Sequence, residues 1–391
     1  MTRRAIILIP GFAKRERLSA RDRLVDALHH YTDGWLTTPG GADAAQSPDA
    51  EHLTATSRQD SSISTDIDVY EAYWGDLVPD WSQESPWARF KRGWGLIGYW
   101  MAGGLFRAVW RWEFPPRTMV AMATAGLTLL LWYAVIVAVL LKALAEGNMP
   151  LPQFITDIEG AEEWIETWLV PAGDWPITLF LVGLLGLGAL EMVANTASFA
   201  KAYLRDDTFG DNTVGLRAKS RARVLEVLDT VTGTGDRKAY DEIHVVAHSL
   251  GGAIAVDALA EYGRDLSRIR LFTWGSALGA LSQQEPLIED EIRKFHESET
   301  RIANWIDVVF KWDYMGSKVP VPKRADGSGR MPRIFPATLE PAVPRRGLAR
   351  FLWLFGIHED YFRSEQAMLM LVKPVADLPP PVVPGARREE A

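Results

Sequence analysis

The sequence contains no cysteine among its 391 residues. Disulfide bonds, thiolate-bound zinc and a cysteine nucleophile are therefore excluded, so covalent chemistry has to use another side chain. The formal net charge is −8, which excludes a global attraction to nucleic acid but not a local basic stripe. A secretory signal is not expected either. The N-terminal apolar run Ala5–Ile9 ends at Pro10-Gly11, whereas a signal core takes about 7–15 apolar residues, and the run is typical of a buried strand.

Charged residues are nearly missing from two long stretches in the middle of the chain. Residues 118–141 contain no charged residue, and residues 175–200 contain only Glu191. Because a membrane-spanning helix needs about 20 apolar residues, we expect transmembrane helices at about 118–141 and 176–199. Glu191 is then expected near the interface or inside the hairpin, protonated or paired. A pair of buried core helices, or a lipase lid, is the alternative.

The charges that flank these stretches differ in sign. Residues 88–117 carry six Lys or Arg against one acid, and residues 143–176 carry seven acids and no Lys or Arg. By the positive-inside rule, the acidic loop is expected outside the cell and both outer flanks in the cytoplasm. Residues 87–112, which are rich in tryptophan and basic residues, are expected to form an interfacial amphipathic segment. The sequence therefore predicts a multi-pass protein of the cell membrane whose other domain is cytoplasmic.

The rest of the chain has the pattern of one α/β domain interrupted by this insert. Apolar segments typical of strands alternate with helical segments, and the expected strands lie within 4–10, 67–77, 242–252, 268–278 and 301–313. This alternation predicts a mainly parallel sheet flanked by helices. Residues 33–65 are rich in small and polar residues and are expected to be a long irregular loop. The expected parts are the first part of the α/β domain, the membrane insert, the second part of the α/β domain and a disordered tail, at 1–86, 87–204, 205–373 and 374–391.

The strongest chemical signal is Ala247-His248-Ser249-Leu250-Gly251. This segment follows the apolar run Ile-His-Val-Val and precedes a second glycine and a helical segment of small residues. A nucleophile elbow needs this context, because its serine occupies a strained turn where small neighbours let the strand and the helix approach each other. The pattern predicts Ser249 as a nucleophile, although so short a match also arises by chance.

An elbow serine requires an acid and then a histidine later in the chain. His358 is the one histidine beyond residue 296 and is the expected general base, with an ordinary surface histidine as the alternative. Asp313 closes an apolar run before a Gly-containing loop, so we expect it to be the acid. Asp307 lies inside the same run, where a strand would bury it away from the catalytic edge. His248 adjoins the serine, but its side chain is expected to point away from Oγ.

The two N–H donors of an oxyanion hole are expected at Phe12 and Leu250. Leu250 follows the nucleophile, and Phe12 follows the first expected strand, where Gly11 permits a close approach of the backbone. A simple turn at Pro10-Gly11 is the alternative. Nothing in the sequence implies a metal or another cofactor.

Taken together, these segments resemble the lipase/esterase-like α/β-hydrolases. The resemblance covers roughly residues 4–80 and 205–372, and it rests on PGF at 10–12, VVAHSLGG around the serine, TWGSAL at 273–278, WIDVVFKWDYMG at 305–316 and HEDYF at 358–362. It implies an α/β-hydrolase fold, a triad of Ser249, Asp313 and His358, and Phe12 and Leu250 as oxyanion donors. Three positions depart from the family pattern without removing a catalytic group. They are Asp307 for the usual Asn, Ala277 for Pro and Ala247 for Gly.

The resemblance and the insert together predict a membrane-anchored serine hydrolase of carboxylic esters. The expected strand at 67–74 ends at the catalytic edge of the sheet and leads directly into the insert, which places the membrane beside the active site. The expected partners are the lipid bilayer and an acyl-lipid or other membrane-soluble ester substrate, and no nucleic acid. A thioesterase or amidase of the same fold, or a catalytically silent membrane scaffold or sensor, is the alternative.

Overall fold

The chain folds as two compact units. The structure, a computed structural model, describes residues 2–32, 36–37, 49–56, 64–111, 116–146, 163, 167, 188–209, 213–233, 240–297, 302–310, 313, 316–321, 334–339 and 357–373. Unit 1 comprises Met1–Val78 and Asp206–Ala391, and unit 2 comprises Pro79–Arg205. Unit 2 begins earlier than the insert expected at 87–204, because Trp81 and Glu84 pack on Arg92, whose Nε lies 2.8 Å from Glu84 Oε2. The tail expected at 374–391 lies outside the described residues.

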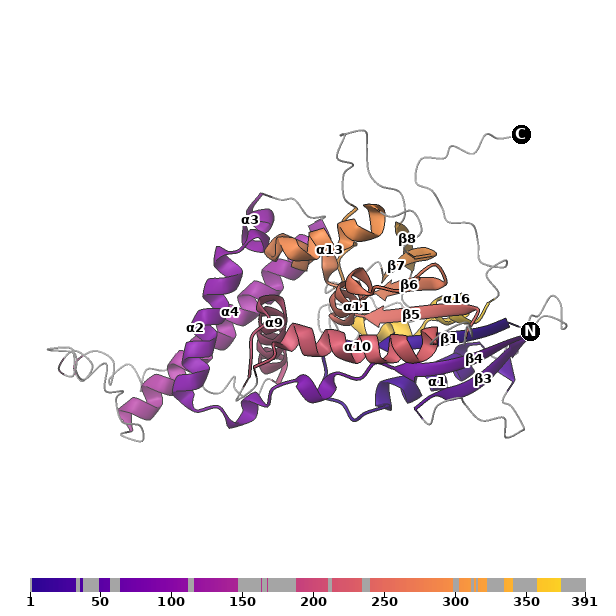
Figure 1. Cartoon of the computed structure of the whole chain (residues 1–391). Coiled ribbons are helices and arrows are strands. Elements are labelled where there is room, and N and C mark those ends of the chain that lie inside the picture. The colour runs from indigo at the N-terminus through magenta and orange to yellow at the C-terminus, as the bar shows by residue number, and fades with distance from the viewer. Residues whose placement is uncertain are drawn as a thin grey trace. The chain divides into compact units, whose positions relative to one another are not determined.

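Unit 1 is built on a single sheet in the order β2-β3-β4-β1-β5-β6-β7-β8 (Figure 1). All neighbouring strands from β4 to β8 are parallel, whereas β2 and β3 form an antiparallel edge. The prediction of a mainly parallel α/β sheet is therefore confirmed. The strands are β1 (Thr2–Ile9), β2 (Leu36–Thr37), β3 (Glu51–Thr56), β4 (Ser64–Glu71), β5 (Glu242–His248), β6 (Ile269–Trp274), β7 (Asn304–Phe310) and β8 (Ile334–Leu339).

The prediction of an irregular loop at 33–65 is wrong in part, because this segment contains β2, β3 and the start of β4. Along β3, Leu53 and Ala55 are buried whereas His52, Thr54 and Thr56 between and after them are only partly buried, which is the alternation of a strand with one buried face. The threonines and charged residues of β3 hide this period of two, because it lacks the Val and Ile that mark the central strands. β8 was also not among the expected strands.

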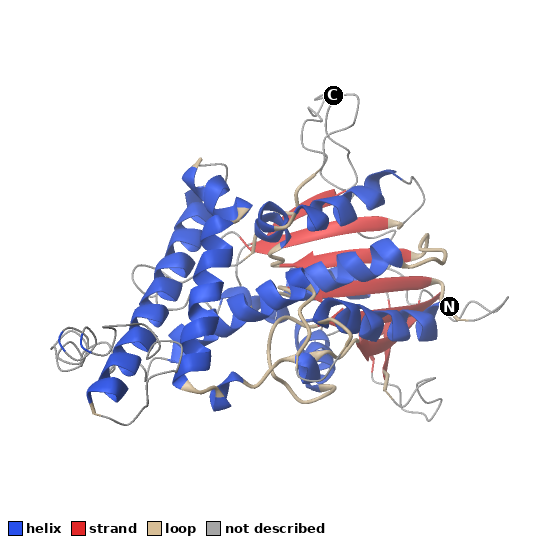
Figure 2. Cartoon of the chain, turned by 60° about the vertical axis from the view of Figure 1, so that its left-hand side comes forward, coloured by secondary structure: helices blue, strands red, loops and turns tan. Residues whose placement is uncertain are grey.

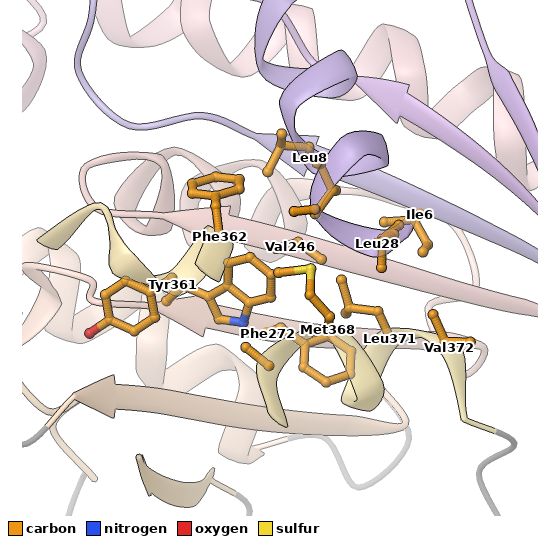
Figure 3. Close-up of a cluster of buried hydrophobic side chains, with 14 of the residues drawn as sticks. Ile6, Leu8, Leu28, Val246, Phe272, Tyr361, Phe362, Met368, Leu371 and Val372 are labelled. Atoms are coloured by element: carbon orange, nitrogen blue, oxygen red, sulfur yellow. The ribbon is translucent and has the colours of Figure 1, made fainter. Parts of the chain in front are cut away.

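Helices α1 (Ser19–Tyr31) and α16 (Glu365–Val372) pack on one face of the sheet, together with the 3₁₀ turn η5 (Asp360–Arg363). Their apolar side chains meet alternate strand residues in the cluster shown in Figure 3, which includes Leu8, Val246, Phe272, Tyr361 and Phe362. Full burial of each such side chain contributes roughly 1.5–3 kcal/mol to folding. Because Tyr361 and Phe362 belong to this core, the turn that carries the neighbouring His358 is held against the sheet.

The helices α10 (Leu216–Thr232), α11 (Gly251–Glu261) and α13 (Pro286–Glu297) cover the other face, with α12 (Leu278–Gln284) beside α13. Figure 2 shows the strands of unit 1 as one continuous sheet with helices lying against it. α11 is buried along residues 251–260 and packs on β1 and β5. Its start lies at the carboxyl end of β5, which is the edge where parallel α/β sheets bind ligands.

Unit 2 is helical in its described part. It contains η2 (Trp81–Gln83), α2 (Pro86–Ala102), α3 (Gly104–Trp110), α4 (Pro116–Ala145) and α9 (Gly188–Arg205). Among the described helices, α4 alone is long and apolar enough to cross a membrane, over Met122–Ala143. The interfacial segment expected at 87–112 forms α2 and α3. The second span expected at 176–199 is described only from residue 188 onward, where it begins α9.

A polar network inside unit 2 surrounds the carboxylate that interrupts the second apolar run. Trp132 Nε1 donates a hydrogen bond to Glu191 Oε2 at 3.2 Å, and Arg92 lies 3.9 Å from Glu191 Oε1. The same guanidinium donates to Asn195 Oδ1 at 3.2 Å and Ser198 Oγ at 2.9 Å. Buried polar groups need such partners to offset desolvation. Glu191 is therefore paired, which is one of the two states expected for it.

Candidate active site

Ser249 occupies the sharp turn between β5 and α11. Its φ angle is 55°, in the left-handed region that costs a non-glycine residue roughly 1–2 kcal/mol. Two backbone hydrogen bonds hold the turn, from Ser249 N–H to the Trp274 carbonyl at 2.9 Å and from Gly252 N–H to the Ser249 carbonyl at 3.0 Å. Backbone strain of this kind persists only where the surroundings enforce it, and it is characteristic of a nucleophile elbow.

The two glycines after the elbow make the strained turn possible. A Cβ on Gly251 would lie 2.4 Å from the Ile9 carbonyl oxygen, and one on Gly252 would lie 2.7 Å from Ser276 Cβ. Both distances are far shorter than van der Waals contact, so any larger residue would push α11 away from the sheet. The Gly-Gly pair that drew attention in the sequence is therefore a packing requirement of the elbow.

Asp313 and His358 form a buried pair at the same edge of the sheet. His358 Nδ1 lies 3.1 Å from Asp313 Oδ1 and 3.0 Å from Asp313 Oδ2. The carboxylate also accepts hydrogen bonds from Gly316 N–H at 3.0 Å and from the Tyr361 hydroxyl at 2.8 Å. An ionised carboxylate is an acceptor only, so Nδ1 must carry the proton and Nε2 is left as the basic nitrogen.

The protonation of this pair follows from its surroundings. Burial disfavours the imidazolium, but the facing Asp313 carboxylate outweighs burial and raises the pKa of His358 above its ordinary value. Burial likewise opposes ionisation of Asp313, and the charge and hydrogen bond of His358 outweigh it, so the pKa of Asp313 is lowered. The pair is therefore suited to accept a proton at Nε2 while Asp313 stays ionised.

The basic nitrogen of His358 is buried and has no hydrogen-bond partner among the described residues. No hydrogen bond therefore links Ser249 Oγ to this nitrogen here, and such bonds are often formed only with substrate in place. His248, which adjoins Ser249 in the chain, links the elbow to the histidine turn that carries His358. Its Nε2 donates to the His358 carbonyl at 2.8 Å, and the two imidazole ring centres lie 4.8 Å apart.

His248 and Tyr361 contact the Asp313–His358 pair, and the sequence did not predict these contacts. Burial, followed by the nearby charge of His358, lowers the pKa of His248 to about 4, so it is a neutral donor that positions the histidine turn. The Tyr361 hydroxyl accepts from the Phe310 N–H at 3.0 Å and donates to Asp313, which fixes the carboxylate at the end of β7. Only the position of Tyr361 in the HEDYF segment hinted at this role.

Asp307 faces a different set of partners. It accepts from the Thr273 hydroxyl at 2.8 Å and from the Val319 N–H at 3.0 Å, inside the core of the sheet. Burial raises the pKa of Asp307 to about 6 despite these hydrogen bonds. Asp313 therefore bonds His358 directly, whereas Asp307 has other hydrogen-bond partners.

The loop after β1 lies directly against the elbow. A Cβ on Gly11 would come within 2.9 Å of both Ser249 Cβ and His248 Nδ1. Phe12, the expected first oxyanion donor, follows in this loop, and Leu250, the expected second donor, is buried at the start of α11. This close approach places the loop beside the serine, and the role of Phe12 and Leu250 as oxyanion donors stays a prediction.

Replacing Gly11 with alanine is expected to lower the rate of any reaction at Ser249 by about 10- to 100-fold, because the new Cβ displaces the loop from Ser249 and small misplacements are costly. Steady-state kinetics on a soluble ester would measure the change. Gly263→Ala is the matched control, since nothing lies within 4 Å of its Cβ. Equal kinetics for both variants would contradict a role of the loop beside the serine.

The described residues contain no cluster of three or more His, Asp or Glu side chains that could hold a metal ion. The site instead gathers a strained serine, a histidine whose basic nitrogen has no partner in the described part of the chain, and a buried carboxylate. These groups suit nucleophilic attack on an acyl carbon. The chain matches no protein-family model, curated protein or solved structure with which it was compared, so the interpretation of the site rests on its geometry.

Proposed function

We propose that this protein is a membrane-anchored serine hydrolase of the α/β-hydrolase type that cleaves carboxylic esters. The observation that carries the proposal is the buried Asp313–His358 pair, whose second imidazole nitrogen has no described partner, next to a strained Ser249. A buried acceptor without a donor is costly, and a serine hydroxyl or a reacting group would satisfy it.

The proposed reaction uses the groups of the site in sequence. His358 Nε2 takes the proton of Ser249 as the oxygen attacks the ester carbonyl, and Asp313 stabilises the resulting imidazolium. The N–H groups of Phe12 and Leu250 stabilise the oxyanion. The protonated His358 then gives its proton to the leaving alcohol. Water attacks the acyl-enzyme while His358 takes its proton, the bond between the acyl carbon and Ser249 Oγ breaks, and His358 returns the proton to Oγ as the acid product leaves.

An acyl lipid or another membrane-soluble ester is the proposed substrate class, because unit 2 is unusually apolar at its surface. Eight of the nine large apolar side chains most exposed among the described residues belong to unit 2. Exposed apolar surface of this extent indicates contact with a membrane or a partner. The eight are Trp94, Met101, Phe106, Trp110, Val120, Leu127, Leu130 and Met192.

The order of segments along the chain supports the same substrate class. Unit 2 begins at Pro79, eight residues after β4 ends at Glu71, and β4 is one of the parallel strands. Within unit 1, the segment after β4 touches the loop after β1, because Trp74 Nε1 donates to the Pro10 carbonyl at 3.1 Å. The chain thus passes the catalytic edge before it enters the apolar unit.

Labelling with a fluorophosphonate probe tests the proposed chemistry, because the probe reacts with activated serines. Full-length protein in membranes is expected to be labelled at Ser249, as identified by mass spectrometry of the modified peptide. Ser249→Ala should remove the label, and Ser276→Ala, which deletes a buried hydroxyl without a described partner, should keep it. An unlabelled wild-type protein with an intact fold would contradict the enzyme assignment and favour a silent scaffold.

The proposed membrane topology has α4 and the segment 176–199 crossing the bilayer, with unit 1 cytoplasmic. A protease-sensitive tag inserted near residue 162 is expected to be cleaved from outside intact cells, because the segment 143–176 is acidic and its flanks are basic. A C-terminal tag is the control and should stay protected until the cells are lysed. Protection of the tag near residue 162, together with extraction of the protein by alkaline carbonate, would show that the apolar helices do not span the membrane.

A further inference from the structure

Glu359 follows the histidine of the site and connects it to the loop after β1. Its carboxylate accepts a hydrogen bond from Arg23 of α1 and another from Arg15 Nη2 at 3.3 Å. Arg23 also donates to the Glu359 carbonyl at 3.3 Å and stacks on the Phe362 ring at 4.4 Å. One side chain of the histidine turn is therefore held by two cations from two other elements.

Arg15 is itself fixed to the molecule. It lies in the loop that begins at Gly11, and its carbonyl accepts a hydrogen bond from the Tyr73 hydroxyl at 2.8 Å. The same loop approaches Ser249 at Gly11 and contains Phe12. A guanidinium anchored in this way can transmit the position of its loop to the carboxylate that it binds.

We propose that Glu359 is a positioning residue that ties the oxyanion loop to the catalytic histidine turn, so that the oxyanion donor and the general base keep their places relative to Ser249. The inference rests on the proposed hydrolase function. Neither Arg15, Arg23 nor Glu359 contacts the reacting atoms. Glu359, Arg15 and Arg23 together, here called the clamp, join two of the four segments that form the site. The elbow and the segment after β7 that carries Asp313 are the other two.

The charges around the clamp support this role. Burial opposes ionisation of Glu359, but His248, which is protonated at the low pH where Glu359 titrates, and the two arginines outweigh burial and lower the pKa of Glu359 to about 2. Glu359 is therefore ionised at all working pH values. Asp313 and Glu359 supply the negative charge that favours protonated His358. Among the described residues, His358 is faced by Asp313, His248 and Tyr361 besides Glu359.

The test compares Glu359→Gln with Asp49→Asn in the full-length protein. Asp49 pairs with Arg17 of the same loop at 2.8 Å, but at the surface and away from the histidine turn, so it is a matched control. Glu359→Gln is expected to lower kcat/KM for a soluble ester by about 10- to 100-fold, since misplaced catalytic groups carry penalties of this size. Its acid limb should move to lower pH, because removing a negative charge lowers the pKa of His358. Asp49→Asn should change neither quantity.

A double-mutant cycle and hydrogen–deuterium exchange complete the test. Arg15→Gln and Glu359→Gln are expected to be non-additive in kcat/KM, whereas Arg17→Gln and Glu359→Gln should add. Glu359→Gln should also speed amide exchange in both the 11–18 and 357–363 segments. Unchanged exchange, or additive effects with Arg15→Gln, would overturn the clamp. A different result would overturn the proposed function. If the wild-type protein shows no hydrolysis that depends on Ser249, the proposed function fails even when Glu359→Gln speeds exchange, and the positioning role fails with it.

Discussion

Ser249→Ala is expected to lower kcat for a short-chain ester by about 10⁶-fold, leaving only the slow reaction that binding and the oxyanion hole support. The loss follows from the geometry of the elbow. No other described hydroxyl occupies a strained turn beside the Asp313–His358 pair, and His358 Nε2 has no described alternative partner. Stopped hydrolysis should be accompanied by unchanged folding, because the substitution removes one oxygen and keeps the Cβ.

The measurement is steady-state hydrolysis of a soluble ester by membranes or detergent-purified protein, with circular dichroism as the check on folding. Ser276→Ala serves as the control, because this buried hydroxyl also lacks a described partner and follows β6 at the same edge of the sheet. It should retain nearly the whole rate. Undiminished hydrolysis by Ser249→Ala would require a different nucleophile. Equal losses of rate for both variants would indicate that either substitution disturbs the structure at this edge of the sheet.

Much of unit 1 could be predicted from the sequence because its central strands carry a local signal. β1, β5 and β6 are short, mostly apolar runs that are buried on both faces, and β7 is nearly so, which is the pattern of a parallel sheet. The elbow is also local, since the strand, the serine and the two glycines are consecutive. β3, the neighbour of the edge strand β2, carried only a weak alternation, and its polar residues suited a loop equally well.

The Asp313–His358 pair was predictable in identity but not in its surroundings. Chain order and the shortage of later histidines singled out His358, and the end of an apolar run singled out Asp313. The contacts of His248 and Glu359 could not be predicted, because both depend on how the histidine turn packs in the folded chain. The contact of His248 with His358 spans 110 positions, and the contact of Glu359 with Arg15 spans 344. Such contacts are products of the tertiary fold and leave no periodic mark in the sequence.

Asp313→Asn is expected to lower kcat by about 10⁴-fold, which is the second largest effect in the site. An asparagine at this position can donate its amide N–H toward Nδ1, so His358 would adopt the other tautomer and present a proton at Nε2 instead of a lone pair. The neutral amide would also not stabilise the imidazolium as the Asp313 carboxylate does. The Tyr361 hydroxyl bonds one carboxylate oxygen and the Gly316 N–H bonds the other, so the single amide oxygen keeps only one of these donors. Loss of the other hydrogen bond should cost about 1–3 kcal/mol, and the fold should persist.

Asp307→Asn is the control for this substitution, because it lies six residues earlier, is equally buried and contacts Thr273 and Val319 instead of His358. Losing one acceptor there should cost about 1–3 kcal/mol of unfolding free energy, with kcat little changed. Kinetics at several pH values and urea unfolding of both variants would separate the two effects. If Asp307→Asn lost the larger share of kcat, Asp307 would have to orient the histidine in the reacting complex, and the acid of the triad would be reassigned to β7 itself.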